Sequence, residues 1–127
     1  MTRVIDSPDL PDVSDRNYSQ ARIDDGTLYV AGQVGWDADN EIVGDDIESQ
    51  TRRTFRNVEL ILEEVDRDLG DVTKVTSYFT HIEEDFPTYK EVWSELFEAP
   101  YPCHTAIGVA KLAAPETRVE VEFQAPV

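Results

Sequence analysis

The chain has 127 residues, of which 40% are apolar, 27 are acidic and 11 are basic, giving a formal net charge of −16. This length predicts a single domain over residues 1–127, and one cysteine excludes an intramolecular disulfide and a zinc site built from several cysteines. The lack of a basic stripe argues against a nucleic-acid partner. The lack of a signal peptide or of a long apolar run predicts a cytoplasmic protein without a membrane partner.

The acidic residues are spread over the whole chain, and only three lysines accompany eight arginines. We interpret this pattern as a surface adapted to high salt, because at about 1 M salt the Debye length falls to roughly 3 Å and self-repulsion is screened. An ordinary acidic protein is the alternative. Neither interpretation identifies an activity.

The N-terminal part predicts a hairpin after an irregular start. Residues 1–17 are rich in proline and aspartate, with a short edge strand expected near Val4 and Ile5. Two strands, Ser19–Ile23 and Thr27–Val34, flank an Asp-Gly dipeptide that accommodates the positive φ angles of a tight turn.

Two amphipathic helices with a strand between them are predicted next. Asp45–Arg67 has apolar residues at steps of three and four, and Gly70 is expected to end it. The β-branched run Val72–Ile82 predicts a strand. Asp85 is expected to cap a second helix with Pro87 in its first turn. The apolar stripe of that helix consists of Phe86, Tyr89, Val92, Trp93, Leu96 and Phe97.

Two further strands, Cys103–Leu112 and Val119–Phe123, complete the order β-β-α-β-α-β-β. This order predicts an α+β fold in which one mixed sheet carries both helices on the same face. The other face receives Val, Ala and Tyr side chains and has no third layer to cover it. We therefore expect a homo-oligomer that buries it.

Few residues suggest chemistry on their own. Glu120 faces away from the apolar side of its strand and is a candidate acid–base group, with plain solvation as the alternative. Cys103 and His104 are adjacent on a strand, so their side chains point to opposite faces, and Cys103 is expected to be a small buried residue. Tyr18 is either a pocket hydroxyl or a packing aromatic, and Asn57 is expected to have a structural role.

Segments along nearly the whole chain resemble the RidA/YjgF family in order and spacing. The matching segments are Tyr18–Ala21, Leu28–Val34, Gln50–Val58, Val72–Phe79, Asp85–Phe86, Pro102–Leu112 and Val119–Glu122. The resemblance implies a chorismate-mutase-like α+β fold and a homotrimer with sites in clefts between subunits. It also implies cofactor-independent hydrolysis of reactive enamines and imines, such as 2-aminoacrylate and 2-iminopropanoate, to 2-oxo acids and ammonia.

The resemblance implies roles for particular residues. Glu120 falls on the family's water-positioning glutamate, Tyr18 on a pocket tyrosine and Gly32 on the glycine beside the pocket. The family has an arginine that binds the substrate carboxylate in this segment. His104 stands at that position in this chain, and Thr105 follows it.

Two further positions in the implied site also differ from the family. Ala31 stands where a serine is usual, and Lys90 stands about where an asparagine is usual. We therefore assign catalysis to Glu120 and His104 and substrate binding to Tyr18, Ala31, Gly32, Lys90 and Thr105, with no metal and no cofactor.

The replacement at position 104 leaves three functions open. A protonated His104 gives fewer hydrogen bonds than an arginine, and the acidic surroundings are expected to favour its protonated form. Lys90, Arg22 or Lys111 are candidates to compensate. The alternatives to imine hydrolysis are hydrolysis of a different small substrate and a non-catalytic module that binds or protects a small ligand.

Overall fold

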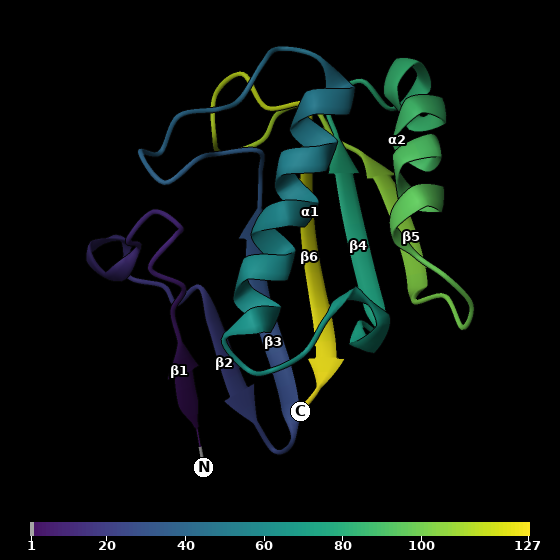
Figure 1. The fold of residues 1–127 in the computed structure, drawn as a ribbon. Helices are drawn as coiled ribbons and strands as arrows, with labels where there is room; N and C mark the ends of the chain where they lie inside the picture. Colours follow the sequence, from purple (N-terminus) through teal and green to yellow (C-terminus); the bar gives the residue numbers. More distant parts are fainter. Residues whose placement is uncertain (1) are drawn as a thin grey trace.

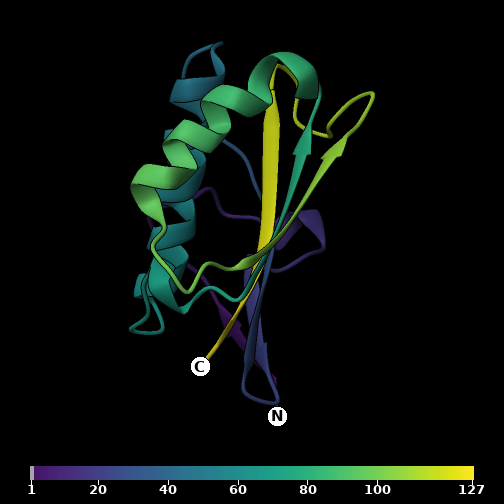
Figure 2. The same cartoon turned by 90° about the vertical axis from the view of Figure 1, so that its right-hand side faces the viewer.

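A six-stranded sheet carries two helices on one face, as the computed structural model shows for residues 2–127 (Figures 1 and 2). The strands are β1 (Arg3–Ile5), β2 (Ala21–Asp24), β3 (Thr27–Gln33), β4 (Lys74–Phe79), β5 (Cys103–Gly108) and β6 (Val119–Pro126), and the helices are α1 (Ile47–Glu63) and α2 (Ile82–Leu96). The sheet order is β1-β2-β3-β6-β4-β5. Only β4 and β5 pair in parallel, so the predicted α+β class, mixed sheet and single helical face are confirmed.

The hairpin and the edge strand lie where the sequence predicted them. Asp25 and Gly26 have φ angles of 51° and 77°, and this left-handed pair lets β2 turn directly into β3. β1 pairs with β2 through Val4 and Arg22, and it adds an edge strand before the predicted order of elements.

The helix boundaries differ from the prediction at three points. α1 begins after Asp46, whose side chain accepts a hydrogen bond from Ser49 N (2.8 Å). It ends at Glu63, before the predicted end, because Asp66 turns the chain with a φ of 56°. Gly70 lies in the separate 3-10 turn η2 (Leu69–Asp71).

The predicted cap of α2 is wrong. The helix begins at Ile82 after His81, so Asp85 lies inside it and Pro87 lies beyond its first turn. Asp85 is 3% exposed and accepts two hydrogen bonds from Arg118, at 2.8 and 3.0 Å. A bidentate guanidinium satisfies this buried carboxylate more fully than a capping role would.

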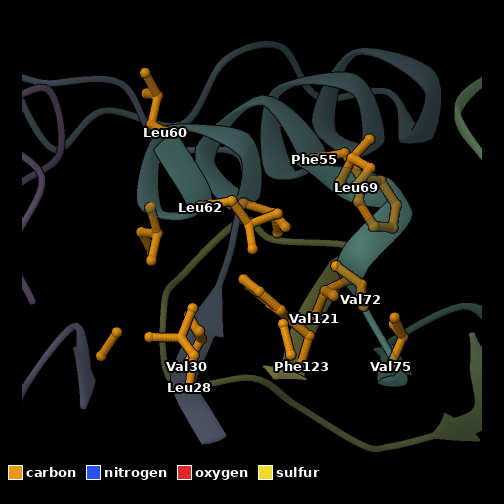
Figure 3. Close-up of a cluster of buried hydrophobic side chains, with 14 of the residues drawn as sticks. Leu28, Val30, Phe55, Leu60, Leu62, Leu69, Val72, Val75, Val121 and Phe123 are labelled. Atoms are coloured by element: carbon orange, nitrogen blue, oxygen red, sulfur yellow. The ribbon is translucent and has the colours of Figure 1, made fainter. Parts of the chain in front are cut away.

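The hydrophobic core fills the space between the helices and one face of the sheet (Figure 3). Alternate residues of β6, Val119, Val121 and Phe123, point into it together with Val75 and Phe79 of β4. The side chains in Figure 3 include Leu28, Val30, Phe55, Leu60, Leu62, Leu69, Val72, Val75, Val121 and Phe123. The residues between them along β6 therefore belong to the opposite face.

No element of residues 2–127 forms a layer over that opposite face, which Figure 2 shows edge-on, away from the helices. It is more polar than the sequence suggested. Tyr29 and Ile107 are exposed on it, but Tyr78 donates a hydrogen bond to Glu122 (2.7 Å), and Lys74 donates one to Thr105 (3.0 Å).

Candidate functional site

The residues assigned from the sequence divide into two groups on opposite faces of the sheet. His104 pairs in register with Val75, a core residue, so its side chain lies on the helical face. Glu120 pairs in register with Tyr78 and lies on the bare face. Because the sheet separates them, one chain does not bring the two catalytic candidates together.

The first group lines a cavity of about 440 Å³ on the bare face, which we call the Glu120 pocket. Tyr18, Ala31, Gly32 and Glu120 were all assigned to the site from the sequence, and the structure brings these four together. The complete lining is Arg16, Tyr18, Ala31, Gly32, Val34, Trp36, Ala113, Ala114 and Glu120. The pocket therefore draws on the N-terminal segment, β3 and the loop after it, the loop before β6, and β6 itself.

Glu120 and Gly32 fit each other closely. A Cβ at position 32 would overlap with Glu120 Oε2, so only glycine leaves this carboxylate in its place. Burial raises the pKa of the Glu120 carboxyl above its usual range, and the nearby negative charge of Glu122 raises it further. A carboxyl with a raised pKa and access to a cavity is suited to exchanging protons with a bound water molecule.

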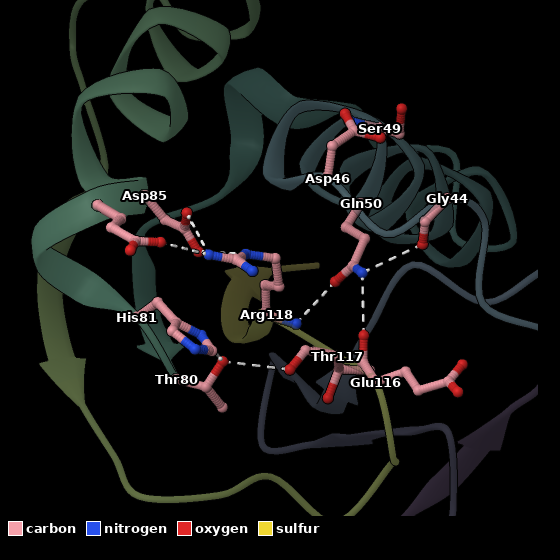
Figure 4. Close-up of polar contacts among 11 residues, drawn as sticks. Gly44, Asp46, Ser49, Gln50, Thr80, His81, Asp85, Glu116, Thr117 and Arg118 are labelled. Carbon is pink, nitrogen blue, oxygen red and sulfur yellow. Dashed lines mark hydrogen bonds and ion pairs between the residues drawn. The ribbon is translucent and has the colours of Figure 1, made fainter.

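Buried polar contacts hold the backbone on both sides of the pocket. The side-chain amide of Gln50 accepts a hydrogen bond from Arg118 N (2.7 Å) and donates to the carbonyls of Glu116 and Gly44, while Asp85 holds the guanidinium of Arg118 (Figure 4). These contacts tie Arg118, the residue directly before β6 and two residues before Glu120, to both helices.

The loop after β3 is held from α1. Asn57 Nδ2 donates to the carbonyls of Val34 and Trp36, both at 2.9 Å, and this confirms its predicted structural role. Arg53 Nε donates to the Trp36 carbonyl as well (3.0 Å). Two pocket residues, Val34 and Trp36, are thereby fixed by one helix.

The second group lies in a hollow of about 390 Å³ between α2 and the start of β5, which we call the His104 pocket. Its lining is Tyr89, Lys90, Trp93, Ser94, Tyr101, Pro102 and His104. The His104 ring lies 4.5 Å from the Trp93 ring, centroid to centroid, and His104 Nε2 is 2.9 Å from the buried Ser77 Oγ. Ser77 is also hydrogen-bonded to Tyr89, so the imidazole is held in one orientation.

The expectation that His104 is protonated is wrong. Burial lowers the pKa of its imidazole below the usual value, and the positive charges of Lys74 and Lys90 lower it further. Desolvation and two neighbouring cations act at short range, whereas the acidic surface is diffuse and screened. At neutral pH the ring is therefore uncharged and does not replace the charge of an arginine.

Several other residues lie outside both pockets. Thr105 is on the bare face and lines neither pocket. Cys103 is exposed and not buried, because β5 is an edge strand without a layer over that face. Arg22 contacts Thr2 (2.9 Å) and Asp24 (3.7 Å), and Lys111 lines a third hollow beside Arg118.

Sequence reasoning missed Arg16 and Trp36. Arg16 ends the 3-10 turn η1 (Ser14–Arg16), inside the segment expected to be irregular. Its guanidinium carbon lies 5.7 Å from the centroid of the Trp36 ring. Only the folded chain places these two residues beside Glu120, since they are 20 residues apart and neither carries a motif.

A family model described as endoribonuclease L-PSP matches residues 11–127 of this chain. The chain belongs to this family, the RidA/YjgF family. A 2-iminobutanoate/2-iminopropanoate deaminase of Dermatophagoides farinae is 34% identical to this RidA/YjgF chain over 106 residues, which are 83% of the chain and 81% of the relative. A RutC family protein of Pyrococcus abyssi is 42% identical over 96 residues, 75% of each chain.

A crystal structure of the Rid family protein YyfA from Yersinia pestis has a TM-score of 0.93 and 27% identity to the chain, and covers 100% of both chains. The sheet and helices described above are therefore those of the RidA/YjgF family. In residues 2–127, neither helix has the length and apolar character needed to cross a bilayer, and no three His, Cys, Asp or Glu side chains gather to hold a metal ion.

Proposed function

We propose that this RidA/YjgF-family chain hydrolyses small 2-imino acids and their enamine tautomers to 2-oxo acids and ammonia, without a cofactor. The observation that carries the proposal is the Glu120 pocket, where a carboxyl with a raised pKa lies against Gly32 and lines one cavity with Tyr18. Relatives that are 31–34% identical and are named 2-iminobutanoate/2-iminopropanoate deaminase support the same reaction class.

The pocket supplies the proton transfers that this hydrolysis needs. The imine enters protonated on its nitrogen. The ionised Glu120 carboxylate accepts a proton from a water molecule as the water oxygen bonds to the imine carbon, which gives a neutral carbinolamine, and Glu120 then donates this proton to the amino nitrogen. As the C–N bond breaks and the C=O bond forms, the carboxylate accepts the hydroxyl proton and passes it to the departing ammonia, which leaves as ammonium together with the 2-oxo acid. Glu120 ends in its starting state, so the cycle needs no other reactant.

We further propose that the chain forms a homotrimer in which the His104 pocket of one subunit adjoins the Glu120 pocket of the next. The sheet keeps the two pockets apart within one chain, and a neighbouring copy can unite them across the bare face. Lys90 would then reach the shared cleft from the partner. The solution mass checks this arrangement, because a monomer at micromolar concentration would contradict it.

The proposed partners are small molecules and copies of this chain, with nucleic acid and membranes excluded, and the proposed location is the cytoplasm. A surface with a net charge of −16 repels a phosphate backbone, although the family description includes the word endoribonuclease.

The reaction is tested by generating 2-aminoacrylate in situ at high salt and measuring ammonia and pyruvate. We expect release above the buffer rate, and a fall of about 100-fold or more in kcat for Glu120→Gln, because the amide cannot accept the proton. The rate should decline as the pH falls through the raised pKa of Glu120. A wild-type rate equal to buffer, or an unchanged rate in the variant, would refute the proposal.

One observation favours a non-catalytic module as the second candidate. The neutral His104 does not supply the cation that the family uses at this position, and without a cation a carboxylate substrate is held weakly. This candidate predicts saturable ligand binding without turnover.

A further inference from the structure

The Glu120 pocket contains a cation that the family pattern does not account for. Arg16 lines this pocket with Glu120 and Gly32, and its guanidinium lies over the Trp36 ring. Among residues 2–127, no carboxylate lies within 4.0 Å of Arg16, although the Arg16 charge adds to the hydrogen bonds that lower the pKa of the exposed Asp12. Arg16 therefore has no close ion pair that an incoming anion would have to break.

Arg16 is attached to an anchored segment. Its backbone N–H donates to the Val13 carbonyl (2.9 Å), and Ser14 N donates to the Asp12 side chain (2.9 Å). The buried Gln20 side chain fixes the preceding chain by donating to the carbonyl of Pro11 (3.2 Å). The Trp36 backbone is held by α1 as described above, so both the guanidinium and the ring under it start from fixed backbone positions. Such preorganisation lowers the entropy lost on binding.

The other candidate cations are placed less well for this pocket. Within one chain, Lys90 lies in the His104 pocket on the opposite face, with Nζ 5.9 Å from the centroid of the Phe86 ring, so it would reach the Glu120 pocket only from a neighbouring subunit. Arg22 is held by Thr2 and Asp24 and does not line the Glu120 pocket. His104 is neutral at neutral pH because its pKa is lowered.

We propose that Arg16 binds the substrate carboxylate in the Glu120 pocket, in place of the arginine that the family carries at position 104. This inference rests on the proposed function and adds the residue that selects acids over neutral carbonyl compounds. Arg16 and Glu120 form no ion pair within 4.0 Å, and both line one cavity of about 440 Å³, a volume that accommodates a small acid. The guanidinium would hold the carboxylate through two parallel hydrogen bonds, with the reacting carbon toward Glu120.

The test is calorimetric titration of the intact protein with pyruvate and with pyruvamide, its neutral analogue. We expect Arg16→Gln to weaken pyruvate binding about 10- to 100-fold, the effect of losing a hydrogen-bonded charge, and to leave pyruvamide binding unchanged. The affinity of Arg16→Lys for pyruvate should lie between those of the wild type and Arg16→Gln, because an ammonium is a point charge that cannot form two parallel hydrogen bonds. Arg3→Gln removes an exposed arginine of β1 and is the charge-matched control.

Three results would overturn the inference. Pyruvate binding unchanged in Arg16→Gln, or lost in Lys90→Gln alone, would place the carboxylate elsewhere. Equal losses for pyruvate and pyruvamide would mean that the substitution distorts the pocket. If the wild type binds neither pyruvate nor pyruvamide, the pocket does not bind a small 2-oxo acid and Arg16 does not have the proposed role.

Turnover separates this inference from the proposed function. If Arg16-dependent pyruvate binding occurs without ammonia release, the inference stands as a binding site and the proposed function fails. If the wild type turns over, Arg16→Gln should raise KM for the imino acid about 10-fold or more with kcat changed less than about threefold, because carboxylate binding is alike in the ground and transition states. If the enzyme is active and Arg16→Gln leaves KM unchanged, Arg16 does not bind the substrate carboxylate, while the proposed function still stands.

Discussion

The Glu120 pocket and the His104 pocket lie on opposite faces of one sheet and are equipped differently. The first combines an acid of raised pKa with a guanidinium that has no ion-pair partner, and the second combines aromatic rings with a neutral imidazole. Burial is the leading cause of both pKa shifts, and in each case it favours the uncharged form. The comparison teaches that the pocket on the bare face pairs an acid with a guanidinium, whereas the pocket on the helical face sets Lys90 and His104 among aromatic rings.

Of the substitutions that test this difference between the two pockets, Gly32→Ala is expected to have the largest effect. The added methyl group overlaps with Glu120 Oε2, so the carboxylate must swing out of position. We expect kcat for imine hydrolysis to fall about 10- to 100-fold, since misplacing a catalytic group by about 1 Å has effects of this size. The free energy of unfolding should change by less than about 1 kcal/mol, because the end of a glutamate side chain can move.

The matched control for this variant is Gly70→Ala, the same substitution in η2, outside both pockets. We expect its kcat to stay within about threefold of the wild type, since a Cβ at position 70 meets only the side chain of Asp68. Steady-state kinetics on both variants decides the matter. If Gly32→Ala is as active as the wild type, Glu120 does not act from its observed position.

Asp85→Ala tests the support beneath the Glu120 pocket. Asp85 is 3% exposed and holds Arg118 at 2.8 Å, so its removal leaves a guanidinium without its buried partner. The Arg118 side chain is 25% exposed, and solvent offsets part of the loss, so we expect a destabilisation of about 2–3 kcal/mol. Chemical denaturation followed by circular dichroism measures it.

Glu84, the exposed ion-pair partner of Arg118, provides the comparison for Asp85→Ala. Glu84 lies 2.9 Å from Arg118, but its side chain is 73% exposed. Glu84→Gln should therefore cost less than about 0.5 kcal/mol. Similar losses in the two variants would mean that burial does not set the strength of this ion pair.

The smallest expected effect concerns the pH dependence of His104. Its pKa is lowered in the folded state, so protonation favours the unfolded chain. The stability that depends on this ring is fully present above the unfolded pKa of about 6.5 and is lost as the pH falls through the lower folded pKa. NMR titration should give a midpoint below 6.5, and the wild type should lose more stability than His104→Gln below that pH. A midpoint above 6.5 would mean that the folded state favours the protonated imidazole, which would contradict the lowered pKa of His104.

The sequence predicted the fold because each core element has a clear period. Alternation along Val119–Phe123 correctly placed Glu120 on the face away from the core. The prediction failed where tertiary contacts override local signals. Asp85 looks like a helix cap until Arg118, 33 residues away, provides a better partner.

The site was only partly predictable for the same reason. Tyr18, Ala31, Gly32 and Glu120 were assigned through the family pattern, and the structure places all four around one cavity. Arg16 was missed because a 3-10 turn in a proline- and aspartate-rich segment has no period, and its neighbour Trp36 is distant in sequence. The charge of His104 depends on burial and on the positions of Lys74 and Lys90, which only the folded structure reveals.

The chain has two tryptophans, and the fold assigns one to each pocket. Trp36 lies under Arg16, and the Trp93 ring lies against His104 at a tilt of 33°. Replacing either indole by phenylalanine would leave a single tryptophan, whose emission, excited selectively over that of the five tyrosines, reports on one pocket alone. Ligand arrival at either place could then be followed optically, without an attached dye.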